Sequence, residues 1–373
     1  MVPFNRRTFL DSLLTTSAVL WAQPSWAIQE KTTTQSPRLR SKLARGQSVA
    51  ATVHPLATDA AIRILERGGS AIDAAVAAAV TLSVVDGHNS GIGGGCFMLI
   101  RSKNGEHLAI DGRERAPAAA RPDMFLRDGK PDTQLSQTGP LACGIPGEIA
   151  ALDGAHRRFG KLPWKDLFDS AIDAAENGYL IGAATLRAIQ EEQKNLEKFP
   201  ASAAIFLRDG KPPKLGDLLI QSDLARTLKQ VAAQGSKWFY EGEFAERAST
   251  YLQSIGGIAK ASDFAHYTAP IRTPLSTSYR QHRILGFPPP SSGGLHIAQM
   301  LTMLEAFPMQ ELYRNQPLQF YHVLAETMKL GKPLRSSRIG SVIRSCQVPE
   351  GINRPRVPSR PSSSDSTRCA DTG

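Results

Sequence analysis

The chain of 373 residues is long enough to bury a sizeable hydrophobic core and to form one large domain or two. Its hydrophobic content of 41% and its modest aromatic content are typical of a soluble globular protein. Much of the net charge of +10 lies near the ends, with +5 in residues 331–373 and +1 in residues 1–27, so it gives little support for a nucleic-acid partner.

Residues 1–27 have the features of an export signal. The twin-arginine sequence Arg6-Arg7-Thr8-Phe9-Leu10 precedes a mildly apolar run and the small-x-small pattern Ser25-Trp26-Ala27. The alternative, an anchor helix, is disfavoured because the run is well below the ~20 residues that span a bilayer. We therefore expect twin-arginine export to the periplasm, with no membrane attachment after cleavage. Residues 28–47 are polar and basic, and are expected to form a flexible arm.

The folded region is expected to begin at residue 48. Residues 49–53 are predicted to form a strand, followed by a helix over residues 56–65 that Gly68-Gly69 ends. Ser70 with Asp73 three residues later resembles a capping box. The alanine-rich helix behind it is predicted to be a buried core helix, because small side chains allow close packing.

A glycine cluster at Gly91, Gly93, Gly94 and Gly95 is the most distinctive stretch. Two apolar runs follow it, 96–100 and 108–110, and Asn104-Gly105 between them predicts a hairpin. The spacing fits neither a GxGxxG fingerprint nor a P-loop, so the glycines are expected to allow close backbone approach beside a site. His88, just before them, is interpreted as a structural hydrogen-bonding residue rather than a catalytic one.

From Pro146 onward the patterns are mostly helical. The cluster Trp238-Phe239-Tyr240 is predicted to pack between helices, Ser262-Asp263 to open a short turn, and residues 273–286 to form two strands. Pro163 is taken as a first helical residue and Ser222 as a cap. The predicted helices cover residues 147–158, 163–178, 183–197, 222–235, 243–253, 295–307 and 317–330.

The segment Pro288–Gly294, with the sequence PPPSSGG, precedes one of these helices. Ser291, Ser292 and Gly293 can place hydroxyl groups and N–H donors at the helix N-terminus, where anions are favoured. An ordinary N-cap would use the same residues, and the sequence leaves both interpretations open. We retain these three residues as candidates for lining a site.

Several blocks, in order along the chain, resemble the large-subunit half of a γ-glutamyltransferase (glutathione hydrolase). The similarity covers roughly residues 48–330. The blocks are GGSAIDAAVA at residues 68–77, the glycine cluster running into FMLIR, AIDGRERAP at 109–117, GIPGEIAAL at 144–152 and PPPSSGGLH at 288–296.

The resemblance implies an α+β fold, the four-layer αββα sandwich of N-terminal-nucleophile hydrolases, which is incomplete without the small subunit. It also implies that Arg113 grips the α-carboxylate of a γ-glutamyl group, because a guanidinium can bind a carboxylate through two parallel hydrogen bonds. The residues alone equally allow a salt bridge from Arg113 to Asp111 or Glu114. Arg115 stands where the family often has an apolar residue.

By the same resemblance, the enzyme cuts its own chain before a threonine in a Thr-Thr-His context, and that threonine attacks the γ-glutamyl carbonyl. This chain contains no Thr-Thr-His, so no catalytic residue is assigned, and activity is expected to need a small subunit as partner. The expected substrates are glutathione or other γ-glutamyl compounds. No cofactor or metal is implied.

The sequence leaves alternatives open for the C-terminal tail, for the function and for the state of the cysteines. Residues 331–373 are rich in Ser, Arg and Pro and are expected to be disordered, and because the resemblance stops at Leu330 in mid-helix, a truncation or shifted reading frame is one hypothesis. The alternative function is a non-catalytic periplasmic module that binds glutamate-like carboxylates or a partner protein. Cys96 and Cys143 are predicted to be buried free thiols, although a disulfide among the four cysteines, which include Cys346 and Cys369, is possible.

Overall fold

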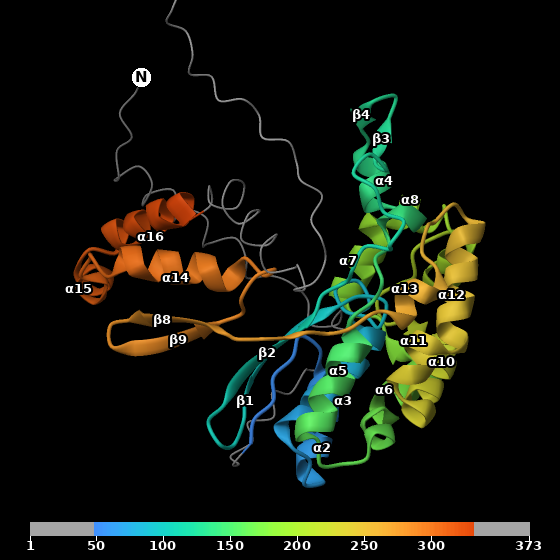
Figure 1. Ribbon diagram of the computed structural model, residues 1–373, viewed down its shortest axis with the longest axis horizontal. Coiled ribbons are helices and arrows are strands. Elements are labelled where there is room, and N and C mark those ends of the chain that lie inside the picture. The colour runs from blue at the N-terminus through green and yellow to red at the C-terminus, as the bar shows by residue number, and fades with distance from the viewer. Residues whose placement is uncertain (1–47, 332–373) are drawn as a thin grey trace, which may run out of the picture. The chain divides into compact units, whose positions relative to one another are not determined.

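The computed structural model describes residues 48–331, which combine many helices with short antiparallel sheets (Figure 1). This agrees with the predicted α+β class. The predicted signal peptide, the arm and, apart from Gly331, the tail lie outside the described residues. Within residues 48–331, no helix is both long and apolar enough to span a bilayer.

The helices α2 (Pro55–Glu66) and α3 (Ala71–Val85) pack against each other, as predicted. Gly68 between them has a φ of +84°, a conformation that glycine adopts without steric cost. The capping box is confirmed: the N–H of Asp73 donates to Ser70 Oγ at 3.1 Å, and the N–H of Ser70 donates to Asp73 Oδ2 at 2.7 Å. The side chains of α3 are mostly buried, which confirms the predicted core helix.

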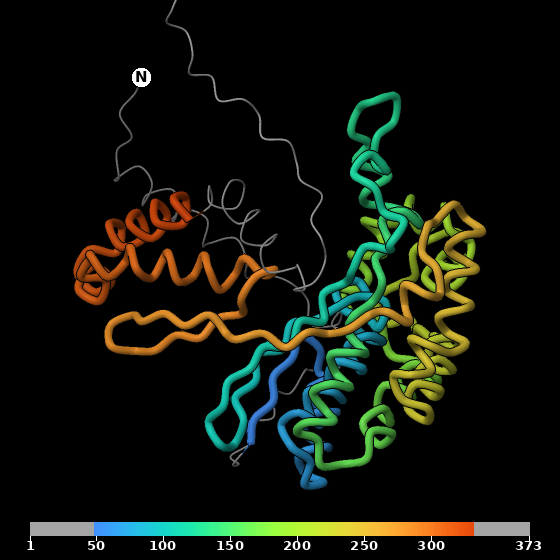
Figure 2. Tube along the Cα trace, viewed as in Figure 1, coloured from blue at the N-terminus to red at the C-terminus, as the bar shows by residue number. Residues whose placement is uncertain are grey.

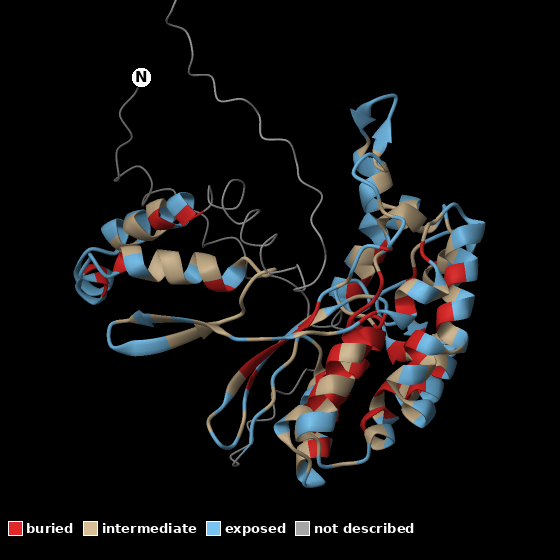
Figure 3. Ribbon diagram, viewed as in Figure 1, coloured by how far each residue is buried: buried red, intermediate tan, exposed pale blue. Residues whose placement is uncertain are grey.

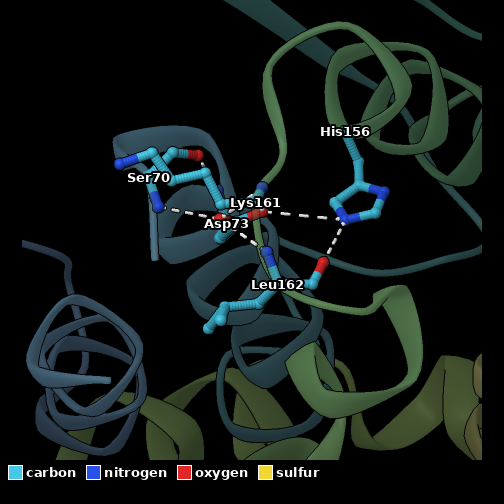
Figure 4. A network of polar contacts seen from close by, with 5 residues as sticks. All are labelled: Ser70, Asp73, His156, Lys161 and Leu162. Carbon is cyan, nitrogen blue, oxygen red and sulfur yellow. Dashed lines mark hydrogen bonds and ion pairs between the residues drawn. The ribbon is translucent and has the colours of Figure 1, made fainter. Parts of the chain in front are cut away.

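Asp73 also ties α3 to the loop after α5 (Glu148–Phe159), as Figure 4 shows. Its fully buried carboxylate accepts N–H bonds from Lys161 at 2.9 Å and from Leu162 at 3.3 Å. His156 Nε2 lies 3.7 Å from Asp73 Oδ1 and 2.9 Å from the carbonyl oxygen of Leu162. One carboxylate therefore satisfies donors from two segments and fixes α3 against α5.

The central sheet has the strand order β1-β2-β7. Strands β1 (Cys96–Arg101) and β2 (His107–Gly112) form the predicted hairpin, and Gly105 in its turn has a φ of +86°. Strand β7 (Ile271–Arg272) pairs antiparallel with β2, so a late segment of the chain lies beside the early hairpin (Figure 2). Strand β2 is almost wholly buried, whereas β1 alternates between exposed side chains and side chains that are half-buried or, at Ile100, buried.

A helical region packs against this sheet through α5, and its buried residues, together with those of α2 and α3, form the main hydrophobic core (Figure 3). Phe239 and Tyr240 are buried, and Phe239 stacks on Phe244 with ring centroids 4.0 Å apart, which confirms the predicted aromatic packing. Besides α5, the region contains β3 (Leu126–Arg127), β4 (Lys130–Pro131), α4 (Thr133–Gln137), η1 (Pro140–Ala142), η2 (Trp164–Leu167), α6 (Asp169–Glu176), β5 (Tyr179–Leu180), α7 (Ala183–Glu191), α8 (Gln193–Leu196), α9 (Pro200–Phe206), β6 (Leu218–Leu219), α10 (Ser222–Gln234), α11 (Ser236–Glu241), α12 (Glu243–Ser254) and α13 (Ala261–Ala265).

The last described elements form a smaller unit of packing. The predicted strands are β8 (Leu275–Tyr279) and β9 (His282–Gly286), which pair antiparallel. Three helices follow: α14 (Gly293–Leu304), α15 (Met309–Asn315) and α16 (Pro317–Gly331). Their small core consists of Leu304, Met309 and Leu312, with Tyr279, Phe320, Val323 and Leu324 packed against it.

Some sequence predictions were wrong in detail. Residues 49–53 form no strand, and Val49 and Val53 are largely exposed, because the apolar pattern there finds no partner strand among residues 48–331. The helices predicted over 163–178 and 183–197 are each divided, the first at Phe168 and the second at Glu192. Pro163 precedes a 3₁₀ turn as its N-cap, and the N-cap of α10 is Gln221 rather than Ser222.

Candidate functional site

The glycine cluster joins α3 to β1 and packs on the N-terminus of α5. The carbonyl oxygen of Gly94 accepts N–H bonds from Gly147 at 2.8 Å and Glu148 at 3.2 Å. A Cβ placed on Gly95 would lie 2.3 Å from the carbonyl oxygen of Gly112. The predicted close approach of two backbones is therefore present, and it brings the cluster beside the end of β2.

Arg113 follows directly after β2, and its backbone is hydrogen-bonded at both ends. Its N–H donates to Asp111 Oδ1 at 3.1 Å, and its carbonyl oxygen accepts a bond of 2.7 Å from the hydroxyl of Tyr267. The side chain is 64% exposed, and its Nη1 lies 3.2 Å from Glu114 Oε2. The backbone of Arg113 is therefore fixed, while the N–H donors of its guanidinium are exposed and one of them lies near the Glu114 carboxylate.

Asp111 has a different partner from the one considered in the sequence. Its buried carboxylate accepts a bond of 2.8 Å from Arg272 Nε on β7. Glu114, not Asp111, is thus the acid next to the guanidinium of Arg113. Because the Asp111 carboxylate is neutralised by Arg272, it orients the Arg113 backbone without engaging the Arg113 side chain.

Arg115 continues the segment as an exposed residue. Its backbone exchanges hydrogen bonds with Ile145, at 3.1 Å and 2.7 Å. Its guanidinium lies over the ring of Tyr267, with Cζ 5.4 Å from the ring centroid. This arginine therefore covers the tyrosine that contacts Arg113.

Glu148 and Cys96, near the glycine cluster, have displaced pKa values. Burial raises the pKa of Glu148 to about 7, against a bond from the backbone of Gly91, and the nearby Glu114 raises it further. Burial, followed by the charge of Glu148, raises the pKa of Cys96 to about 12, so this thiol stays protonated at neutral pH. Glu148 lies in the first turn of α5 and is 5% exposed, and its carboxylate accepts the bond from the backbone of Gly91 in the glycine cluster.

The serines of the second candidate segment lie at the start of α14. The N–H of Gly293 donates to Ser291 Oγ at 3.2 Å, and the side chain of the N-cap, Ser292, makes no capping hydrogen bond to α14. A Cβ on Gly294 would lie 2.3 Å from the carbonyl oxygen of Phe287, so the chain turns tightly there. Phe287 packs on Phe97 of β1, with centroids 4.3 Å apart.

The structure does not join the two candidate segments directly. Within residues 48–331, no hydrogen bond or ion pair links Arg113 to Ser291, Ser292 or Gly293. Two side-chain atoms of α14, His296 Nε2 and Gln299 Oε1, are buried without a hydrogen-bond partner in the described part of the chain. Glu114 Oε2, beside Arg113, is also buried without a hydrogen bond in the described residues, so each segment has unpartnered buried polar atoms.

Two further sequence interpretations can be compared with the structure. His88 Nε2 lies 3.4 Å from Asp86 Oδ1, and Asp86 also accepts bonds from Asn89 and Ser90, in line with a structural role for His88. Cys96 and Cys143 are free, but the expectation that both are buried was wrong: Cys96 is only partly buried, and Cys143 is exposed in the loop after η1. Cys346 and Cys369 lie outside the described residues.

Sequence reasoning missed Tyr267, Arg272 and Glu148. Glu148 is part of the block GIPGEIAAL, so the local sequence could have identified it. Tyr267 and Arg272 carried no local signal, because they contact the Arg113 segment only through folding. In the described range 48–331, no group of three or more His, Cys, Asp or Glu side chains could hold a metal ion.

Comparison with known proteins gives consistent matches. The family model described as gamma-glutamyltranspeptidase matches residues 57–354, a range that runs past Leu330. The glutathione hydrolase proenzyme of Escherichia coli K12 is 40% identical over 296 residues, which cover 79% of this chain and 51% of that protein. The glutathione hydrolase proenzyme of Bacillus subtilis 168 is 39% identical over 308 residues, covering 82% and 51%. The chain thus spans about half the length of these curated relatives.

Solved structures agree with the sequence matches. Helicobacter pylori gamma-glutamyltranspeptidase superposes with a TM-score of 0.76 and 35% identity, covering 81% of this chain and 90% of that one. Gamma-glutamyltranspeptidase from Pseudomonas nitroreducens, complexed with L-DON, gives 0.72 and 30%, covering 79% and 90%.

Proposed function

Because the chain belongs to the γ-glutamyltranspeptidase family, we propose that it is the large-subunit portion of a glutathione hydrolase and that Arg113 binds the γ-glutamyl group of the substrate. The family consists of enzymes with the fold of N-terminal-nucleophile hydrolases, and the predicted fold class is confirmed by the structural neighbours. The activity, the substrate and the small-subunit partner of this chain are parts of the proposal.

The single observation that carries the proposal is the presentation of Arg113. The guanidinium is 64% exposed, while the N–H and the carbonyl group of the same residue are both hydrogen-bonded. A planar guanidinium on a fixed backbone matches a carboxylate through two parallel bonds. The α-carboxylate of a γ-glutamyl compound would displace Glu114 from the guanidinium of Arg113 or share the guanidinium with it. The position of the Arg113 backbone would already be set before the substrate binds.

The start of α14 supplies a second set of donors in this proposal. Ser291, Ser292 and Gly293 would line the site, since the N-terminus of α14 favours negative charge and Ser292 has no side-chain capping bond. One such negative charge is the charge that develops on the oxygen of a carbonyl group when a nucleophile attacks its carbon. Within residues 48–331 no hydrogen bond or ion pair links these three residues to Arg113, so their role depends on the rest of the enzyme.

The chemical step requires a group that these 373 residues do not include. In the family, a threonine hydroxyl attacks the γ-carbonyl carbon, the amine is released, and water or an amino acid then takes the acyl group from the threonine. The family's Thr-Thr-His is absent from the sequence. We therefore propose that the chain turns over only when a small subunit supplies that threonine.

The test is to co-express residues 28–373 with the small-subunit half of the Escherichia coli relative and to measure glutamate release from glutathione. We expect the pair to copurify and to be active, the chain alone to be inactive, and Arg113→Ala to lower kcat/KM by about 100-fold, the loss expected for a bidentate ion pair. Activity of the chain alone, or an active pair that is indifferent to Arg113→Ala, would contradict the proposal.

The non-catalytic module is the competing function, and the same experiment separates the two. If no active pair forms, but the chain alone binds glutathione and loses that binding with Arg113→Ala, then the chain is a carboxylate-binding module. The absence of Thr-Thr-His is the observation that keeps this alternative in view.

We also propose export to the periplasm by the twin-arginine route, supported by Arg6-Arg7 and by the Ser25-Trp26-Ala27 pattern. Changing Arg6 and Arg7 to lysine should retain the precursor in the cytoplasm. N-terminal sequencing of the periplasmic protein should begin at Ile28.

A further inference from the structure

The segment that carries Arg113 is held by a residue from a distant part of the chain. Tyr267, which follows α13, donates its hydroxyl to the carbonyl oxygen of Arg113 at 2.7 Å, across a sequence separation of 154 residues. Tyr267 is only 8% exposed. Burial raises its pKa, so the hydroxyl remains a donor throughout the physiological range of pH.

Two glycines leave the space that this contact needs. A Cβ on Gly147 would lie 2.0 Å from the hydroxyl oxygen of Tyr267 and 2.3 Å from the carbonyl oxygen of Gly112. A Cβ on Gly112 would lie 2.6 Å from the Cβ of Ala151 and 3.0 Å from the carbonyl oxygen of Gly147. Any side chain at either position would push apart the elements that bring the hydroxyl to Arg113.

The ring of Tyr267 is fixed on two sides. It stacks on Tyr240 with centroids 5.5 Å apart and an interplanar angle of 13°, and the guanidinium of Arg115 lies over it. Tyr240 directs its own hydroxyl elsewhere, donating to the carbonyl oxygen of Pro146 at 3.0 Å. The two tyrosines therefore share the stacking contact, but only the hydroxyl of Tyr267 bonds to Arg113.

On the proposed function, which this inference takes as its basis, we propose that Tyr267 is a positioning residue for the α-carboxylate grip. Its hydroxyl fixes the carbonyl group of Arg113, while Asp111, oriented by Arg272, fixes the N–H of the same residue. Because the N–H and the carbonyl group of Arg113 are both fixed, the side chain extends from a fixed backbone. Its guanidinium therefore approaches a carboxylate from one direction. Loss of the Tyr267 hydroxyl frees one of these two groups and loosens that approach.

The experiment compares Tyr267→Phe with the matched control Tyr240→Phe in the two-subunit complex described above. Each variant keeps its ring and loses one buried hydroxyl. The readout is kcat/KM on glutathione and on an analogue that lacks the α-carboxylate, 4-aminobutyryl-cysteinylglycine. We expect Tyr267→Phe to lower kcat/KM on glutathione about 10-fold, mainly through KM, and to leave the analogue unchanged, so that selectivity for the carboxylate falls. Tyr240→Phe should preserve the ratio between the two substrates.

The outcomes separate this inference from the proposed function. If Arg113→Ala leaves the selectivity intact, the assignment of Arg113 as the grip fails. If Arg113→Ala removes the selectivity but Tyr267→Phe does not, or if Tyr267→Phe weakens both substrates equally, then Tyr267 has only a structural role and the inference fails alone.

Hydrogen exchange on the chain without a partner gives a second measurement that requires no activity. Tyr267→Phe should speed exchange in the peptide that covers residues 108–117 more than Tyr240→Phe does, while both variants stay folded by circular dichroism. Equal exchange in that peptide, or global unfolding of Tyr267→Phe but not of Tyr240→Phe, would overturn the inference.

Discussion

The segment around Arg113 and the segment around Ser291 are held in different ways. Arg113 lies on a backbone hydrogen-bonded to Asp111 and Tyr267, beside a buried ion pair and two glycines with no room for a side chain. Ser291 lies in a half-exposed turn where its hydroxyl accepts one bond, from Gly293. Both segments have buried polar atoms without a hydrogen bond within residues 48–331: Glu114 Oε2, which has only its ion-pair contact with Arg113, and His296 Nε2 and Gln299 Oε1 of α14.

The contrast shows which part of a binding site one portion of a protein can preorganise by itself. The backbone of Arg113 is fixed by hydrogen bonds whose partners, Asp111 and Tyr267, are both within the described residues. The Ser291 segment is held by contacts that are local in sequence: the tight turn at Gly294 and a bond of 3.1 Å from the N–H of Ser291 to the carbonyl oxygen of Pro288. We infer that the first segment behaves as a rigid element in this chain alone, and that the second takes its final geometry from whatever packs on α14.

The strongest test of the rigid segment is Gly147→Ala. The added methyl group would lie 2.0 Å from the Tyr267 hydroxyl and 2.3 Å from the Gly112 carbonyl oxygen, so we expect a loss of about 4 kcal/mol in unfolding free energy, from overpacking together with a broken hydrogen bond. Urea titration followed by circular dichroism measures it. Gly154→Ala is the control, because a Cβ there meets nothing within 4 Å and should stabilise α5 by up to about 1 kcal/mol. Equal effects at the two glycines would mean that the Arg113 segment is not tightly packed.

A second test removes the partner of the buried Asp111. Arg272→Ala leaves that carboxylate, 4% exposed, without its ion pair, and we expect a loss of about 3 to 4 kcal/mol in unfolding free energy. The matched control is Arg283→Ala on β9, where an arginine is exposed in the C-terminal part and should contribute less than about 0.5 kcal/mol. Differential scanning calorimetry of both variants gives the comparison. A loss at Arg283 as large as that at Arg272 would remove the contrast between the two regions.

How much of this was predictable depends on sequence separation. The capping box of Ser70 and Asp73 and the hairpin around Gly105 were predicted correctly, because three or four neighbouring residues determine them. The bonds from Tyr267 and Arg272 to the Arg113 segment join residues 154 and 161 positions apart, and no local pattern encodes them. The false strand at residues 49–53 has the same cause, since an apolar run cannot show whether a partner strand exists.

A third test uses pH. Burial raises the pKa of Glu148 to about 7 from an ordinary value of 4.5, so the folded protein binds this proton more tightly than the unfolded chain does. The resulting stability is fully present below about pH 4.5 and is lost as the pH rises through about 7, a fall in unfolding free energy of up to about 3 kcal/mol. Urea midpoints between pH 4.5 and 8 measure it. Glu148→Gln should remove this slope, whereas Glu241→Gln at the exposed end of α11 should keep it. A slope that persists in Glu148→Gln would assign the pH dependence to another group.

The smallest effect on stability is expected in the Ser291 segment. Ser291→Ala removes one bond of 3.2 Å in a half-exposed turn, so the unfolding free energy of the chain should change by less than about 0.5 kcal/mol. Ser254→Ala, which removes a comparable exposed bond at the end of α12, is the control for stability. In the two-subunit complex the two variants should part, because Ser291→Ala should lower glutamate release from glutathione about 10-fold while Ser254→Ala leaves it unchanged. A loss of 2 kcal/mol or more from Ser291→Ala in the chain alone would show that this segment is also fixed without a partner. The Arg113 and Ser291 segments would then differ in their chemical roles and not in how rigidly the chain holds them. The buried atoms of α14 that lack a partner would then need an explanation within this chain.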